Sequence, residues 1–293
     1  MLIDCHVHCA LSGLGQLEKN LMAAPSAVRQ HWFENLAALY VEHGIGAVRD
    51  GGDKYGVGPV FKEIAQEAGI IFKTPLVALF KKGHYGGFLG QGLSDLSDCK
   101  KAMDSLLSKG PDHIKIIQSG IMSFETYGDA GGLEFSREEL VYMIDRAHDA
   151  GLKVMVHVNT PQGVKMSALA GADTVEHGYC IDDEAIAVLK ETGCIWVPTL
   201  APFANIAACS KDHFLAPYRE ISKRYFENHK KQVRRAHKAG VKIALGSDSG
   251  ATLVAHGEAT LQELGYLKDC GLTEEMLFEN SCRVLGIDPA AYR

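Results

Sequence analysis

Amphipathic stretches alternate with short apolar runs along most of this chain. Each amphipathic stretch ends at a glycine, a residue that readily takes the left-handed conformation that closes a helix. The closing glycines are Gly44, Gly69, Gly110, Gly151, Gly171, Gly193, Gly240 and Gly271. Apolar, β-branched runs typical of buried strands follow the first seven glycines, and one more such run opens the chain. The expected strands cover residues 2–8, 45–49, 70–80, 113–118, 153–158, 173–177, 194–199 and 241–247.

Start signals support several of the helices. Ser136 and Glu139 have the spacing of a capping box, Asp182 precedes an apolar stripe, and Pro59 suits a first helical turn. Eight strands that alternate with eight helices predict a single α/β domain, a (β/α)₈ TIM barrel over residues 1–293. A doubly wound open sheet is the alternative.

One segment interrupts this alternation. Residues 201–218 contain two prolines and show no clear period. We therefore expect a long loop there. Because the segment follows the seventh strand, a barrel would place it over the face where the C-terminal strand ends meet.

The composition fits a folded protein of this size. The chain has 293 residues, and a TIM barrel typically takes about 250. Hydrophobic residues make up 46% and charged residues 23%, which is ordinary for a globular protein and excludes a disordered chain. With 30 Lys and Arg against 36 Asp and Glu, the net charge of −6 disfavours a nucleic-acid partner. A small-molecule substrate is expected instead.

Features of the termini and the cysteines suggest a location. The chain opens with Met1, Leu2, Ile3 and Asp4, so an acidic residue stands where a signal peptide would be apolar. No apolar run approaches the roughly 20 residues of a membrane helix, so no membrane partner is expected. The 8 cysteines are scattered without a CxxC pair, which favours reduced thiols in a cytoplasmic protein.

The first expected strand carries histidines at its end. Side chains alternate along a strand, so Asp4, His6 and His8 share one face. His6 and His8 therefore direct two imidazoles toward one point, as a metal site requires. A single His-x-His pair is also common among core or exposed histidines, so the pair alone decides little.

Other strands end in residues of the same chemistry. Lys115 interrupts an apolar strand, and a lysine is rarely buried there without a partner. His157 and His177 end the fifth and sixth strands, and Asp248 follows the eighth. In a barrel, the C-terminal ends of the strands meet at the face that carries the active site. Their joint placement at that face predicts a metal site.

These residues resemble the metal-dependent hydrolases of the amidohydrolase superfamily. The similarity is greatest to the imidazolonepropionase-related and Xaa-Pro dipeptidase-like branch, and it runs from residue 2 to about residue 287. Besides the six residues His6, His8, Lys115, His157, His177 and Asp248, it rests on residues 47–52, 113–116, 171–178, 198–200 and 246–250.

The resemblance implies a binuclear metal centre. It assigns His6, His8 and Asp248 to one divalent ion, and His157 and His177 to a second. Lys115, carboxylated by CO₂ to a carbamate, would bridge both ions. Imidazoles and carboxylates suit Zn²⁺, which is the expected metal, with Mn²⁺ and Fe²⁺ as alternatives.

The resemblance also implies a reaction. We expect hydrolysis of an amide or related C–N bond, as in a dipeptide or an N-acyl amino acid, by metal-activated hydroxide with Asp248 as proton shuttle. A lactonase and a deaminase of the same superfamily remain alternatives, although no Glu follows His157 as it does in many mononuclear deaminases. A Schiff-base lyase using Lys115 and a non-catalytic binding protein are less favoured, since all six ligand positions are filled.

Some features depart from the family or stay unassigned. Many members of this branch carry an accessory β-sandwich, which we expect to be absent or very reduced because the first strand starts at once and the chain ends soon after residue 286. His84, in a glycine-rich loop, and Arg49 are candidate substrate contacts. For His84 a mere mobile lid is the alternative, and for Arg49 an internal salt bridge. Aromatic residues Tyr127, Tyr179 and Phe203 are candidates for the pocket without a placement. The sequence leaves open whether the protein forms a homo-oligomer.

Overall fold

The computed structural model describes residues 1–12 and 22–292. Its named strands pair only in parallel, as three- and six-stranded ladders ordered β1-β2-β3 and β5-β4-β6-β7-β8-β9. The strands are β1 (Leu2–Val7), β2 (Ile45–Asp50), β3 (Ile71–Lys73), β4 (Ala78–Lys81), β5 (Gly90–Leu93), β6 (Ile114–Ile117), β7 (Val154–Val158), β8 (Thr174–His177) and β9 (Ile195–Val197).

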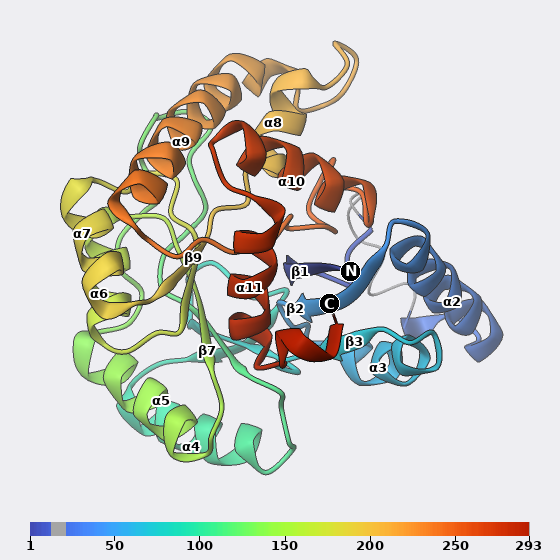
Figure 1. Ribbon diagram of the computed structural model, residues 1–293. Coiled ribbons are helices and arrows are strands. Elements are labelled where there is room, and N and C mark those ends of the chain that lie inside the picture. Colours follow the sequence, from blue (N-terminus) through green and yellow to red (C-terminus); the bar gives the residue numbers. More distant parts are fainter. Residues whose placement is uncertain (13–21, 293) are drawn as a thin grey trace.

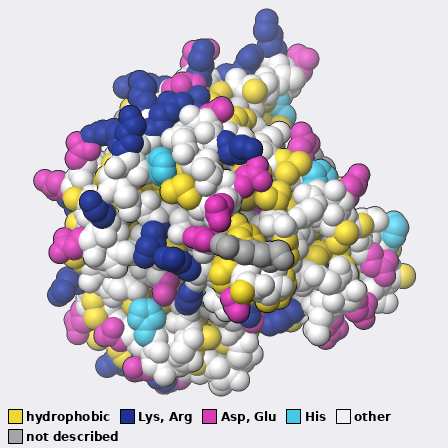
Figure 2. All heavy atoms as spheres, in the orientation of Figure 1, with side chains coloured by type: hydrophobic (Ala, Val, Ile, Leu, Met, Phe, Trp, Pro, Cys, Tyr) yellow, Lys and Arg dark blue, Asp and Glu magenta, His cyan; other side chains and the backbone are white. Residues whose placement is uncertain are grey.

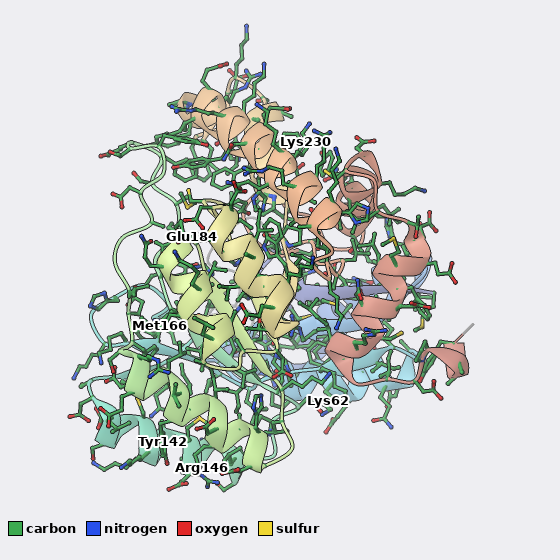
Figure 3. All side chains as sticks on the ribbon, turned by 60° about the vertical axis from the view of Figure 1, so that its left-hand side comes forward. Lys62, Tyr142, Arg146, Met166, Glu184 and Lys230 are labelled. Atoms are coloured by element: carbon green, nitrogen blue, oxygen red, sulfur yellow. The ribbon has the colours of Figure 1, made fainter. Side chains whose placement is uncertain are left out.

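Helices form an outer layer around these strands (Figure 1). They are α2 (Ser26–Glu42), α3 (Val57–Glu67), α4 (Leu96–Leu107), α5 (Arg137–Asp149), α6 (Pro161–Leu169), α7 (Asp183–Thr192), α8 (Ala201–Ala208), α9 (Arg219–Ala239), α10 (Glu258–Asp269) and α11 (Glu274–Leu285), with short 3₁₀ turns η1 (Ala216–Tyr218) and η2 (Pro289–Tyr292). Figure 3 shows labelled side chains on successive helices of this layer: Tyr142 and Arg146 on α5, Met166 on α6, Glu184 on α7 and Lys230 on α9.

The segment 241–249 closes the ring between β9 and β1. Trp196 N donates to Lys242 O at 2.9 Å, Cys5 N donates to Leu245 O at 2.8 Å, and Asp248 N donates to His6 O at 2.8 Å. The segment thus fills the eighth strand position, although it makes only isolated bridges. The predicted α/β TIM barrel is confirmed, and the open-sheet alternative is wrong.

The expected strand 70–80 is split into β3 and β4. Pro75 lacks the N–H that a ladder needs, and Leu76 adopts a φ of 67°. The two pieces still occupy one barrel position, because β3 pairs with β2 and β4 pairs with β6. The short strand β5, beside β4, was not predicted.

The predicted helix signals are confirmed. Ser136 and Glu139 form a complete capping box, Asp182 caps α7, and Pro59 lies in the first turn of α3. All eight closing glycines have left-handed backbone, with φ between 69° and 99°. These local signals therefore fix where the helices between the strands begin and end.

The loop expected at 201–218 is wrong for its first half, while residues 209–215 lie in neither a helix nor a strand. That first half is α8, where Pro202 stands in the first turn, a position that needs no N–H donor. The helix buries Ala201, Phe203, Ala204 and Ile206, so its sequence has almost no polar face and shows no amphipathic period. The second half includes the turn η1 before α9 begins.

Other expectations from composition can be compared with the structure. None of the eight cysteines forms a disulfide, as expected. Across the described part of the chain, no helix has both the length and the apolarity to cross a bilayer. Charge is unevenly spread despite the net acidity: Figure 2 shows Lys and Arg gathered where α9 lies, and α9 contains eight of them.

Candidate active site at the strand ends

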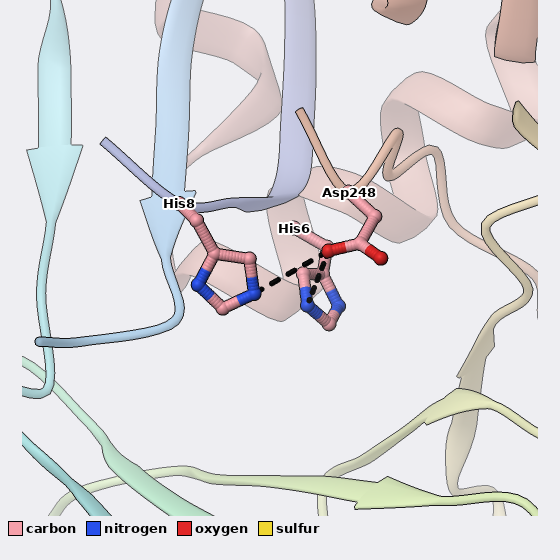
Figure 4. Close-up of side chains that lie close together, drawn as sticks. All are labelled: His6, His8 and Asp248. Atoms are coloured by element: carbon pink, nitrogen blue, oxygen red, sulfur yellow. Dashed lines mark ion pairs between the residues drawn. The ribbon is translucent and has the colours of Figure 1, made fainter. Parts of the chain in front are cut away.

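His6, His8 and Asp248 lie together where β1 and the eighth strand position end (Figure 4). Asp248 Oδ1 is 3.5 Å from His6 Nε2 and 3.3 Å from His8 Nε2. One ligand-type atom from each residue lies within 4.8 Å of the others. Such a trio of two imidazoles and a carboxylate is a donor set that Zn²⁺ and similar ions prefer.

Asp4 places this trio rather than joining it. Its carboxylate accepts the backbone N–H of Ser247 at 3.0 Å and the hydroxyls of Ser247 and Thr260 at 2.6 Å. These bonds tie the end of the eighth strand position to β1. Asp248, the next residue after Ser247, is thereby held opposite His6 and His8.

His6 is oriented from behind by a buried ion pair. Its Nδ1 donates to Glu176 Oε2 at 2.8 Å, and Arg49 donates to the other oxygen of Glu176 at 2.9 Å. Arg49 also donates to Cys5 O at 2.7 Å. With Nδ1 used in this way, Nε2 of His6 keeps its lone pair toward Asp248, the arrangement that carboxylates commonly impose on metal-binding histidines.

His157 and His177 lie next to this trio. The ring centroids of His157 and His177 are 4.5 Å apart, and those of His6 and His177 are 4.8 Å apart. Nδ1 of His177 is 2.8 Å from the hydroxyl oxygen of Thr199, and Nε2 of His157 is 3.3 Å from Gly120 O. Each histidine therefore has one ring nitrogen bonded to the protein and the other left for a ligand.

Lys115 completes the set from β6. It is 1% exposed, and its Nζ finds no hydrogen-bond partner among the described residues. Burial lowers the pKa of the Lys115 amine to about 8, so the uncharged amine that reacts with CO₂ is more accessible than in a surface lysine. An unpartnered buried polar group costs about 1–3 kcal/mol, which suggests that this position normally meets a ligand.

Burial also favours the neutral form of three of these imidazoles. It lowers the pKa of His157 to about 3 and lowers the pKa values of His6 and His177 well below the ordinary value, with Lys115 adding to the effect in each case. Metal binding requires the neutral imidazole. Nε2 of His6, which faces Asp248, is buried and has no hydrogen-bond partner among the described residues, as fits a divalent-cation site.

The backbone is strained at three positions of the site. His177, Thr199 and Asp248 have φ values of 65°, 53° and 62°, which β-branched threonine in particular rarely adopts. Such strain persists only where the surroundings enforce it, and it concentrates at functional sites.

The two candidate substrate contacts, Arg49 and His84, and the pocket candidate Tyr127 have partners outside the cavity lining. Arg49 is 2% exposed and forms the internal salt bridge that the sequence left as its alternative role. His84 pairs with Glu134 at 3.0 Å. Tyr127 stacks on Tyr225, with ring centroids 4.5 Å apart. None of these residues is among the described residues that line the cavity above the histidines.

That cavity has a volume of about 420 Å³. His8, Lys115, His157, His177 and Asp248 line it, and so do Tyr179 and Phe203, which the sequence suggested without a placement. Sequence reasoning missed the roles of Glu176 and Thr199. The only signal for Glu176 was its place directly before His177 at a strand end.

Comparison with known proteins agrees with this geometry. A model of the amidohydrolase family matches residues 2–289. An uncharacterised protein of Mycobacterium tuberculosis is 27% identical over 291 residues, covering 96% of this chain and 71% of the relative. Ochratoxinase of Aspergillus niger is 27% identical over 232 residues, covering 75% of this chain and 46% of that enzyme.

Solved structures share the fold. A crystal structure of a Xaa-Pro dipeptidase with bound methionine in its active site aligns with a TM-score of 0.80 at 23% identity, covering 98% of this chain and 75% of the other. Because the family model spans nearly the whole chain, the protein belongs to the amidohydrolase family, which generally uses divalent metal ions, and is a hydrolase that acts on carbon–nitrogen bonds.

Proposed function

We propose that the protein is a binuclear metal-dependent hydrolase that cleaves an amide or related C–N bond, with dipeptides and N-acyl amino acids as the substrate type. The observation that carries the proposal is the meeting of His6, His8 and Asp248 beside His177, His157 and the buried, unpartnered amine of Lys115. A merely structural cluster of this kind would leave several buried polar atoms without partners, at a cost in stability.

The residues divide into two groups of ligands. His6, His8 and Asp248 would hold one ion, and His157 and His177 the other. The Lys115 amine, converted to a carbamate by CO₂, would supply two anionic oxygens shared by both ions. Zn²⁺ is the metal we propose, since three imidazoles or more with carboxylate oxygens are a typical zinc environment.

Asp248 is the proposed proton carrier. Divalent ions at such a site would polarise the carbonyl of a substrate and lower the pKa of bound water toward neutrality. Asp248 lines the cavity and its Oδ1 faces the two imidazoles, so its other carboxylate oxygen would take the proton from the attacking water. Asp248 then hands that proton to the departing amine, which is a poor leaving group unless it is protonated.

Metal analysis with an activity screen tests the proposal. Elemental analysis of purified protein should give close to two divalent ions per chain, and a chelator should abolish hydrolysis of a dipeptide and N-acyl amino acid library until metal is restored. Full activity in metal-free protein contradicts the proposal.

Lys115→Ala tests the bridging role. The variant should lose much of the bound metal, because the shared anionic ligand is gone. Small carboxylates such as acetate or propionate should restore part of the activity by entering the vacated space. A Lys115→Ala protein with wild-type metal content and rate would rule the carbamate out.

A further inference from the structure

The cavity has two chemically different parts. Its floor consists of the polar residues His8, Lys115, His157, Asn159, His177 and Asp248. Its walls are mainly apolar or aromatic and include Tyr85, Phe88, Ile121, Phe124, Tyr179 and Phe203, although the polar Thr252 is also part of the lining. The walls therefore offer contact area for an apolar group directly above the reacting position.

One wall rises beside His157, from the loop between β4 and β5. Tyr85 lies with its ring centroid 5.3 Å from that of His157, and Phe88 lies 5.6 Å farther along. Burial raises the pKa of the Tyr85 hydroxyl, so Tyr85 stays a neutral aromatic surface. This wall begins at the floor and continues toward the mouth.

A second wall rises beside His177. The ring of Tyr179 stacks at 5.8 Å from His177, Phe203 lies 4.6 Å from Tyr179, and Phe124 lies 6.1 Å from Phe203. Aromatic rings thus stand beside two histidines of the floor, at distances where rings interact favourably with one another.

The second wall is built to stay in place. Phe203 stands on α8, and the N–H of Ala201 at the start of that helix donates to the buried carboxyl group of Glu263 at 2.8 Å. Asn205, on the same helix, donates to Leu253 O at 2.9 Å. A wall fixed in this way loses little conformational freedom when a ligand packs against it.

The mouth of the cavity exposes apolar side chains. Phe214 is 72% exposed, Ile121 52% and Phe88 36%, and all three line the cavity. Exposed apolar groups gathered around one opening are typical of a ligand-binding site.

The charges of the lining residues are a second observation about the walls. Among the described lining residues, Lys115 is the only lysine or arginine, and it belongs to the floor. Arg49 is engaged behind the floor by Glu176, and His84 is paired with Glu134. The walls as described offer no cation to pair with a substrate carboxylate.

We infer that this enzyme selects its substrate by a bulky apolar or aromatic group packed between the two walls beside the scissile bond, and not by an ion pair to a substrate carboxylate. The inference rests on the proposed function and narrows its substrate class to amides with large apolar acyl groups. A phenyl ring in place of a methyl group buries several more methylene-sized groups, so it should change affinity by about tenfold or more.

Three amides test this with the metal-loaded enzyme. N-benzoyl-phenylalanine should be hydrolysed with kcat/KM at least tenfold above N-acetyl-phenylalanine. N-benzoyl-phenethylamine, which lacks only the carboxylate, should stay within about threefold of N-benzoyl-phenylalanine. Equal rates for the benzoyl and acetyl compounds, or a loss above tenfold on removing the carboxylate, would overturn the inference.

A binding measurement separates this inference from the proposed function. N-benzenesulfonyl-phenylalanine and N-methanesulfonyl-phenylalanine are not amides, and calorimetric titration gives their affinities without turnover. Tighter binding of the benzene compound supports the inference, and equal binding overturns it. Failure to hydrolyse any of the three amides counts against the proposed function alone.

Wall variants locate the effect. Two substitutions, Phe203→Ala and Ile121→Ser at a half-exposed position, should each lower the preference for the aromatic compound several-fold. This applies to the benzoyl-to-acetyl ratio of kcat/KM and to the corresponding ratio of affinities. Leu169→Ala is the matched control, because Leu169 is 60% exposed on α6 and lies outside the cavity lining. An unchanged ratio in Ile121→Ser and Phe203→Ala would also overturn the inference.

Discussion

The floor and the walls of the cavity differ in what fixes their side chains. On the floor, His177 bonds Thr199, while His6 beneath it bonds Glu176, and both bonds are 2.8 Å long. In the walls, Tyr85 and Phe203 are held largely by neighbouring rings. Directional bonds fix an atom's position, whereas ring packing mainly fills volume. Floor substitutions should therefore affect all substrates alike, and wall substitutions should change the preference among them.

The largest expected effect is on the floor. His157→Ala removes a proposed ligand, so metal content should fall and activity should drop by more than the about 10–100-fold typical of losing an outer partner. All substrates should be affected equally, and helix content by circular dichroism should stay near wild type. His31→Ala, on the exposed face of α2, is the control. A His157→Ala variant with wild-type metal content and rate would exclude His157 as a metal ligand.

Asp248→Asn separates proton transfer from metal binding. Asparagine is nearly equal in size and keeps one oxygen toward His6 and His8, so substantial metal should remain. The rate should fall by at least about 10²-fold, the contribution of a general acid–base group. Measuring kcat and bound metal on the same sample decides this, and a rate within tenfold of wild type at full occupancy would exclude Asp248 as the proton carrier.

The floor was largely predictable from the sequence. Strand alternation predicts that His8 shares one face with His6, which lies beneath the floor. The order of strands in a barrel predicts that the other strand ends meet at the same place. Their supports were not predictable, because Glu176 meets Arg49 across 127 positions of sequence and His6 across 170. Such contacts depend on ring closure, which no local pattern encodes.

The walls were predicted poorly for a different reason. Helix α8 carries Phe203 and Ile206 toward the cavity and buries Ala201 and Ala204 as well, so its sequence lacks the polar face by which a helix is recognised. The prolines of residues 201–218 indicated a loop, yet Pro202 only begins the helix. The alternation of apolar and polar residues identifies a helix that lies between the core and water. It fails for a helix such as α8, which lies between the core and an apolar cavity.

Glu176→Gln tests whether support from behind matters as much as the ligands. Glutamine offers Arg49 and His6 one neutral oxygen in place of a carboxylate, so His6 should hold its orientation less firmly. Metal affinity should fall by about 10–100-fold. Glu184→Gln, on the surface of α7 (Figure 3), removes a carboxylate from an exposed pair with Lys165 and should leave metal affinity unchanged. If Glu176→Gln bound metal as tightly as Glu184→Gln, Glu176 would have no role in orienting His6 for the metal.

The smallest effect concerns the stability of a wall. Glu263, which caps α8, is fully buried, and burial raises its pKa from the ordinary 4.5 to about 8. An acid whose pKa is raised by folding stays protonated in the folded state while the unfolded chain ionises, so it weakens the fold increasingly as pH rises from about 4.5 to 8.

Glu263→Gln removes that penalty and keeps an oxygen for the N–H of Ala201. Its Tm should match wild type near pH 4 and exceed it by several degrees at pH 8, because each pKa unit of such a shift corresponds to about 1.4 kcal/mol of stability. Glu191→Gln, exposed on α7, should show no such trend. Because the wall keeps its shape, the benzoyl-to-acetyl ratio should not change. A Tm difference that is constant with pH would show that Glu263 does not carry its proton in the folded protein.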